Sequence, residues 1–288
     1  MLNLQALETF VTNAPQGVNE TSIPNVQVFW SHKAMPRHLQ AYLFGLVFIL
    51  QGYKIGYLGA RRFQYGAGQY LAVGFPMHFE CETHLQNHTP LLGIFIQLEV
   101  SELSRLAAQM MSCKALSTGI VERSGVEPLS ISAPIYEVLG RMLNVINQPK
   151  QGAVLGELYV RELCYHVLQE DNSAVLLSHL NRSTPQNRVA QTLEYMEQNL
   201  YRNPPVDELA QYAHMSIASF NRHFKQITGR SVVQYIKTMR LMRARHMLAV
   251  EGQSVKQVAE LLGYGSAAQL SRDFKAYFGL PPKWAGQV

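Results

Sequence analysis

The sequence lacks any apolar run long enough to cross a membrane as a helix. Its longest, Ala41–Leu50, has ten residues and ends at Gln51 and Gly52, whereas a membrane helix needs about 18 or more. The first ten residues carry no basic side chain, so they do not have the pattern of a secretory signal. We therefore expect a cytoplasmic protein with no membrane partner.

Cysteine is also scarce. Cys81, Cys113 and Cys164 are widely spaced and odd in number, and no Cys-x-x-Cys pair occurs, which argues against a disulfide framework or a zinc site. Glu80 and Glu82 flank Cys81 and would raise the pKa of its thiol. We interpret Cys81 and Cys113 as buried packing residues and not as thiols that react with electrophiles.

Acidic residues are depleted at one end of the chain. Residues 182–288 hold 14 Lys and Arg against 7 Asp and Glu, a net charge of +7, whereas residues 1–181 hold 11 against 13, a net charge of −2. Such an asymmetry is typical of a nucleic-acid-binding domain joined to a domain with another task. Chance variation of surface charge explains it equally well, so charge alone does not decide.

The first hundred residues contain short runs rich in β-branched and aromatic residues, separated by turn signals such as Gly59, Gly66 and Gly68. This pattern predicts an antiparallel β-barrel or sandwich. Helical periodicity starts at Ser101, which we expect to cap the first helix. Further helices are predicted at 133–148 and 153–169, and 171–185 is the expected linker. The expected strands are 25–30, 42–50, 52–58, 58–73, 76–84 and 91–100.

The last third repeats itself at an offset of 50 residues. Ser219–Gly229 reads SFNRHFKQITG and Gln269–Gly279 reads QLSRDFKAYFG. Each copy predicts a helix, a tight turn and a second helix, over about 206–229 and 255–279. In the second helices, Phe220, Phe224, Leu270 and Phe274 are expected to face inward, and the polar residues between them outward.

Exposed arginine on such a helix is suited to the DNA major groove, since its planar fork can bind the two acceptors of guanine. Lysine is suited to phosphates. A solvated surface would explain one copy, but two copies in register favour DNA binding. Between them, residues 232–248 predict a helix with two apolar stripes, one of them including Val233. We interpret it as a spacer that sets two reading helices about one DNA turn, roughly 34 Å, apart.

These residues resemble the DNA-binding domain of the AraC/XylS family of transcription regulators, from about Gln186 to Trp284. The resemblance implies that an activator contacts double-stranded DNA and RNA polymerase, and it also implies a homodimer. The family usually has proline where Val232 stands, a departure away from the reading positions. The implied base-reading positions are Ala218, Asn221, Arg222, Ala267, Ala268, Ser271 and Arg272. The outward lysines, Lys225 and Lys275, are the expected phosphate contacts.

The first part is similar to a cupin-like N-terminal module of one subgroup of this family, which implies an effector-sensing domain. The fold class predicted is thus α+β with two domains: a cupin-like antiparallel barrel with flanking helices at 1–180, and an all-α domain of two helix-turn-helix units joined by a long helix at 181–288. Candidate side chains for a small organic effector are Trp30, His38, Tyr42, Lys54, Tyr57, Tyr70 and His78.

Three functions remain open at this point. The favoured one is a sequence-specific transcription regulator that is not an enzyme and needs no cofactor. A metal-dependent cupin enzyme fused to DNA-binding helices is an alternative, although the chain lacks a His-x-His pair near His78, His84 and His88, so no metal is expected. The other is a non-specific DNA-compacting protein, which would bind its own promoter and random DNA equally well.

Overall fold

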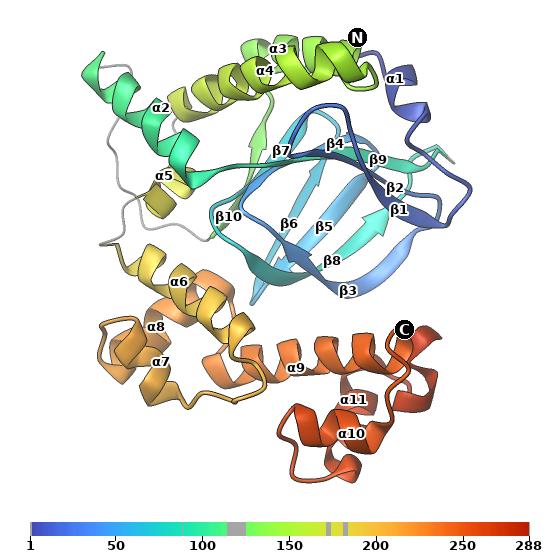
Figure 1. Cartoon of the computed structure of the whole chain (residues 1–288), viewed down its shortest axis with the longest axis vertical. Helices are drawn as coiled ribbons and strands as arrows, with labels where there is room; N and C mark the ends of the chain where they lie inside the picture. The colour runs from blue at the N-terminus through green and yellow to red at the C-terminus, as the bar shows by residue number, and fades with distance from the viewer. Residues whose placement is uncertain (1, 88, 114–124, 171–173, 181–183, 288) are drawn as a thin grey trace. The chain divides into compact units, whose positions relative to one another are not determined.

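The computed structural model describes residues 2–87, 89–113, 125–170, 174–180 and 184–287. The chain divides into two compact units (Figure 1): Met1–Asn187 with Ile227–Gly229, and Arg188–Gln226 with Arg230–Val288. The first unit combines antiparallel sheets with helices and the second is helical, which confirms the predicted α+β class. Within the described residues, every helix is too short or too polar to span a bilayer.

Two antiparallel sheets form the β part of the first unit. The six-stranded sheet has the order β1-β2-β9-β4-β7-β10, and the four-stranded sheet has the order β3-β8-β5-β6. In the larger sheet these strands are β1 (Gln16–Glu20), β2 (Val26–Ser31), β9 (Leu91–Gln97), β4 (Gly45–Gln51), β7 (Gln69–Val73) and β10 (Val126–Ser130). In the smaller they are β3 (Met35–Tyr42), β8 (Met77–His84), β5 (Tyr53–Leu58) and β6 (Arg61–Gly66).

Three of these strands, β1, β3 and β10, are absent from the sequence prediction. All three lie at the edge of a sheet, where a strand pairs on one side only and tolerates polar residues and proline. Accordingly β3 contains Pro36, β10 contains Pro128, and β1 has a single large apolar residue, Val18. The hydrophobic signal of a strand weakens at such positions, so the prediction recovered the central strands.

Helices cover one face of the six-stranded sheet (Figure 1). Phe48 and Ile94 belong to the same buried cluster as Leu139 and Leu163 from the helices. Two details differ from expectation: the first long helix starts before Ser101, and Pro149 begins a helix instead of breaking one, since proline suits the first helical turn. The helices are α1 (Gln5–Glu8), α2 (Val100–Ser112), α3 (Ala133–Val145), α4 (Pro149–Gln169) and α5 (Ala174–Leu180).

The second unit consists of helices, including the two predicted helix-turn-helix pairs. Pairs α7–α8 and α10–α11 flank the long helix α9. The elements are α6 (Pro185–Gln198), α7 (Val206–Tyr212), α8 (Ile217–Thr228), α9 (Val232–Ala249), α10 (Val255–Leu261), α11 (Ala267–Phe278) and the 3₁₀ helix η1 (Pro282–Gln287).

Helix α9 packs on both pairs, as its two apolar stripes predict. Near its start, Tyr235 meets Phe224 of α8 edge to face, with ring centroids 5.4 Å apart. Near its end, Leu241 and Met247 join the core cluster of the second pair. Val233, expected in one stripe, is instead 66% exposed. The helix begins at Val232, as predicted, after a capping box at Ser231, and Val232 is buried in place of Val233.

Candidate functional site

Each pair of helices is connected by the same kind of turn. His214 and Gly263 follow α7 and α10 with left-handed backbones, at φ 51° and 66°. The second helix of each pair then starts at a serine: the Ser216 Oγ accepts from the Ser219 N–H at 3.3 Å, and the Ser266 Oγ from the Gln269 N–H at 3.1 Å. Since His214 is the counterpart of Gly263, the extra residue of the second copy lies after the turn.

The inward side chains of α8 and α11 fix which face each helix turns outward. Phe220, Phe224, Leu270 and Phe274 have no exposed surface. They recur every four residues, which on a helix is one stripe. The opposite face of each helix is therefore held towards solvent by the core that its aromatic residues form.

The predicted DNA-binding residues lie on these outward faces. Seven are exposed, whereas Ala267 and Ser271 are half-buried. Among the described residues, the four basic side chains of this set form no ion pair or hydrogen bond, whereas Lys237 of α9 binds Asp273 at 2.8 Å. The exposed seven are Ala218, Asn221, Arg222, Lys225, Ala268, Arg272 and Lys275.

Two polar members of the set are turned back on their own helices. The Asn221 side-chain amide donates to the Ile217 carbonyl at 3.0 Å, and the Ser271 hydroxyl donates to the Ala267 carbonyl at 2.8 Å. In this arrangement Asn221 keeps one amide N–H and its side-chain oxygen for a partner, whereas Ser271 can only accept. The four basic residues are the charged donors that this surface offers without rearrangement.

The seven candidate effector residues separate into three groups, because side chains alternate between the faces of a strand. His38, Tyr42 and Lys54 point between the two sheets, since they pair with or flank the inward residues of β8. Trp30 and Tyr70 belong to the cluster under the helices. Tyr57 and His78 lie on the other face of the four-stranded sheet. The seven therefore do not share one face, and which of them bind an effector stays a prediction.

The interior group surrounds Cys81, which is fully buried. The Gln40 side-chain oxygen accepts from the Lys54 ammonium at 2.7 Å and from the Cys81 thiol at 3.1 Å. The His38 Nε2 lies 4.0 Å from the Cys81 sulfur. Tyr42, on the same face of β3, completes the group. A thiol, an imidazole, an ammonium and a phenol thus meet inside the barrel.

These neighbours overturn the expected electrostatics of Cys81. Glu80 and Glu82 point to the opposite face of β8, so they do not act on the thiol as expected from sequence adjacency. Burial by itself raises the pKa of Cys81, but the hydrogen bond with His38 and the charge of Lys54 lower it below its ordinary value. Burial lowers the pKa of Lys54, and the hydrogen bond with Cys81 raises that of His38.

His78 is held neutral by its surroundings, since burial lowers its pKa to about 4. An unfolded histidine titrates near 6.5, so between pH 6.5 and 4 the unfolded chain binds a proton that the folded chain does not. The titration of His78 therefore costs no stability above pH 6.5, and it lowers the free energy of unfolding as the pH falls towards 4. We expect His78→Gln to remove about 2–3 kcal/mol of this decline, as measured by urea denaturation across this range.

The exposed His32 of the same unit provides the matched control. A change in pH dependence that occurs in His78→Gln and not in His32→Gln assigns the effect to His78. Parallel curves for His78→Gln and the wild type would mean that His78 titrates normally.

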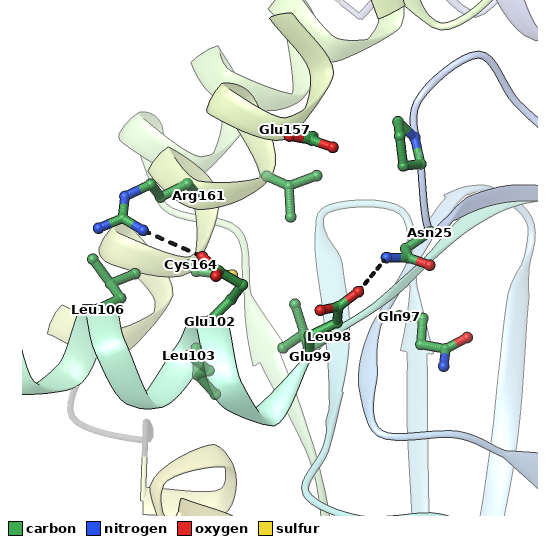
Figure 2. A pocket seen from close by; sticks show the side chains of 12 residues that line it. Asn25, Gln97, Leu98, Glu99, Glu102, Leu103, Leu106, Glu157, Arg161 and Cys164 are labelled. Atoms are coloured by element: carbon green, nitrogen blue, oxygen red, sulfur yellow. Dashed lines mark hydrogen bonds and ion pairs between the residues drawn. The ribbon is translucent and has the colours of Figure 1, made fainter. Parts of the chain in front are cut away.

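A pocket of about 300 Å³ lies outside the barrel, between α2, α4 and the loops before β2 and after β9 (Figure 2). None of the candidate effector residues lines it. Four of its polar groups are engaged in pairs: Asn25 donates to Glu99 at 3.1 Å, and Arg161 pairs with Glu102 at 3.6 Å. Since no unpaired buried polar group points into it, this pocket shows no convergent binding chemistry.

A metal site needs several ligand side chains that converge on one point. Where the chain is described, no three His, Cys, Asp or Glu side chains come together in an arrangement that could hold a metal ion. His84 instead contacts Glu82 at 3.0 Å on the outer face of the four-stranded sheet, and His88 lies outside the described residues.

Each of the two units matches a known protein family model. Residues 22–175 match the family model for the AraC-type transcriptional regulator N-terminus, and residues 209–284 match a helix-turn-helix domain. The chain is 30% identical over 207 residues to the HTH-type transcriptional regulator GbdR of Pseudomonas aeruginosa, which covers 72% of this chain and 50% of that protein.

A second relative is the HTH-type transcriptional regulator ArgR of the same organism, 29% identical over 147 residues, 51% of this chain and 44% of that protein. The chain thus spans about half the length of the curated relatives it matches. Among solved structures, ToxT from Vibrio cholerae is similar, with a TM-score of 0.55, 11% identity, and coverage of 90% of this chain and 97% of that chain. This likeness shows the shared fold.

Proposed function

Because the chain belongs to the family of AraC-type transcriptional regulators, we propose that it binds a specific duplex DNA site and controls transcription in response to a small molecule. Residues 181–288 bind the DNA and residues 1–180 sense the effector. The matched relatives are transcriptional regulators, and the proposal includes no enzymatic step. We also propose RNA polymerase and a second copy of the chain as partners.

The observation that carries the proposal is the pair of outward faces on α8 and α11. Each presents an arginine and a lysine three residues apart, free of other partners among the described residues. Arg222 and Arg272 are assigned to base edges, where a good bidentate contact contributes about 1–3 kcal/mol. Lys225 and Lys275 are assigned to phosphates, which position the protein without reading sequence.

The small residues of the set have their own role in this proposal. Ala218, Ala267 and Ala268 cannot donate a hydrogen bond, but alanine can contact the methyl group of thymine. Their size also brings the helix axis close to the groove. With α9 18 residues long, about 27 Å, the two reading helices suit neighbouring turns of one face of the duplex.

A competition assay distinguishes this function from DNA compaction. The full-length chain, at a fixed salt concentration, is titrated with its own upstream region and with random duplex of equal length. We expect the upstream region to be bound at least about 1,000-fold more tightly, since base contacts add to the shared phosphate term. Equal affinity for the two duplexes would instead support a compacting protein.

For the sensor we propose the barrel interior, where His38, Tyr42 and Lys54 meet, and not the outer or helix-facing residues. A buried ammonium with two further donor groups suits a ligand with acceptor oxygens. Screening small metabolites by thermal shift should find compounds that raise the melting temperature of the wild type, because a ligand that binds the folded state stabilises it. A ligand whose effect is unchanged by Lys54→Met would place the site elsewhere.

A further inference from the structure

The chemistry gathered around Cys81 exceeds what packing requires. A thiol in a core ordinarily has apolar neighbours and behaves as a small hydrophobic residue. Cys81 instead faces Gln40 at 3.1 Å, His38 at 4.0 Å and, through Gln40, the Lys54 ammonium. None of these residues takes part in the proposed DNA surface.

Lys54 is the second unusual element of this group. Lys54 is only 6% exposed, and a buried ammonium is costly unless a negative group compensates its charge. Among the described residues, its hydrogen bond goes to the neutral Gln40 and no Asp or Glu forms an ion pair with it. The Cys81 thiol is the neighbour that can become negative. The structure thus pairs an uncompensated cation with an ionisable nucleophile.

The remaining groups that face Cys81 do not compete for this role. His38 and Tyr42 come from β3, Lys54 from β5 and Tyr65 from β6, and the Tyr42 and Tyr65 hydroxyls are hydrogen-bonded to each other at 2.6 Å. Burial raises the pKa of both tyrosines well above the ordinary range, so they stay neutral. The six-stranded sheet adds apolar residues on this side: Val47, Ile49, Leu71, Val73, Phe29 and Phe95.

We propose that Cys81 is the nucleophile of a covalent site for small α,β-unsaturated carbonyl compounds, with Lys54 and His38 as the positioning residues that hold the thiol ready. The proposal deepens the effector-sensing role and rests on it for its biological meaning. Under this proposal the barrel interior modifies an effector covalently as well as binding it.

The neighbours of Cys81 select this class of electrophile. The carbonyl oxygen, which is conjugated with the reacting β-carbon, can accept a hydrogen bond from the Lys54 ammonium. That ammonium uses only one of its three N–H groups on Gln40. The interior is lined by flat rings, among them Tyr42 stacked on Phe79 with centroids 4.2 Å apart. A small planar molecule therefore suits the chemistry of these surroundings.

The reaction balances without another reagent. The Cys81 proton passes to His38, which leaves a thiolate beside two positive groups. The sulfur electron pair forms an S–C bond to the β-carbon, the C=C π pair moves to the α-carbon and carbonyl oxygen, and the resulting enolate is stabilised by Lys54. His38 then returns the proton to the α-carbon. The product is a thioether, with no net gain or loss of electrons by the protein.

The group comes nearest to solvent at the edge of the small sheet. Strand β3 is an edge strand, and its pairing with β8 is irregular between Met35 and His38, a kind of feature that locally disrupts a ladder. His38 is half-buried at this point. It therefore lies between solvent and the thiol, where a proton carrier is needed.

Acrylamide, a small α,β-unsaturated amide, is the probe. The full-length protein is treated across pH 5–10 without DNA, and the labelling of Cys81, Cys113 and Cys164 is followed by peptide mass spectrometry. Cys113 is exposed and not buried as expected from the sequence, because it follows the end of α2. It is therefore the accessible reference thiol, and we expect the Cys81 rate to reach half its maximum at a lower pH than the Cys113 rate. Cys164, buried with a pKa raised to about 12, should remain unlabelled and report that the protein is folded.

Variants identify the cause of the reactivity. Lys54→Met should move the Cys81 midpoint up by about one pH unit or more, and Lys54→Arg, which keeps the charge, should restore much of it. Lys33→Met, at an exposed lysine of the same unit, is the matched control and should match the wild type. His38→Gln provides an independent variant, expected to slow Cys81 labelling most near neutral pH.

Two results would overturn the proposal: Cys81 unlabelled when Cys113 has reacted completely, or the same Cys81 profile in Lys54→Met, His38→Gln and Lys33→Met. Since DNA is absent, these results are independent of the competition assay. A protein that fails to react at Cys81 but still selects its duplex would retain the proposed function and lose the covalent site.

Discussion

Arg222→Ala and Arg272→Ala are each expected to lower the affinity for the specific duplex by roughly 5- to 150-fold, or about 1–3 kcal/mol. The two arginines lie on different helices and share no partner, so their losses should add in the double variant. Affinity for random duplex should fall far less, because each variant removes one charge among many phosphate contacts. Titration of both duplexes at one salt concentration measures the ratio.

Arg202→Ala is the matched control. Arg202 belongs to the same unit and its side chain is 62% exposed, but it pairs with Glu208 at 3.5 Å and lies outside α8 and α11. The control should change specific and random binding by a similar small factor. If both reading-helix variants keep full specific affinity, the assignment of α8 and α11 as reading helices is wrong.

Phe274→Ala is expected to reduce the free energy of unfolding of the second unit by about 3–5 kcal/mol, the usual cost of removing a buried aromatic ring. Phe274 has no exposed surface and packs in one cluster with Leu241, Met247 and Val258. A loss of that size approaches the whole stability of a small domain. Urea denaturation, together with hydrogen exchange of α10 and α11, measures it.

Phe274→Leu keeps most of the apolar volume and should cost clearly less, which separates the cavity from a general intolerance of change. Specific DNA binding should be lost with the stability in Phe274→Ala, although no reading residue has changed. Undiminished protection of α11 in Phe274→Ala would show that the ring does not hold this helix in place.

The helix-turn-helix pairs could be predicted closely because several local signals coincide there. Serine caps, aromatic residues four apart and a repeated spacing each restrict the same segment, and the repeat doubles the evidence. The exception is instructive: Val233 was placed in an apolar stripe because periodicity alone does not fix the phase of a helix. Its capping box at Ser231 and Gln234 sets that phase, and the signal for it was present in the sequence.

The barrel was predicted as a class and not as a topology. Central strands carry long β-branched runs, whereas the edge strands β1, β3 and β10 are polar or contain proline. One of these edges bears on the proposed sensor, since β3 supplies His38 and Tyr42. The sequence pattern alone could not rank these residues, because the strand that carries them was not recognised.

The effector candidates could not be sorted by face from the sequence for a related reason. Alternation within a strand shows which residues share a face, but which face is internal depends on pairing between distant strands. Lys54 faces Cys81 because β5 pairs with β8, and Trp30 faces the helices because β2 pairs with β9. Sequence neighbours were therefore a poor guide to Cys81: the flanking glutamates are remote from its thiol, and the residues that act on it lie 43 and 27 positions away.

Because α9 contributes to the cores of both helix pairs, neither pair can be replaced independently of α9. Transplanting α10 and α11 from a relative would leave them resting on a foreign stretch from Leu241 to Met247. A workable chimera would need its junction inside α9, between Met239 and Leu241, so that each graft carries the part of α9 on which it packs. Evolution of new operator preference is therefore expected to proceed by changing the outward side chains of α8 and α11, and not by shuffling whole pairs.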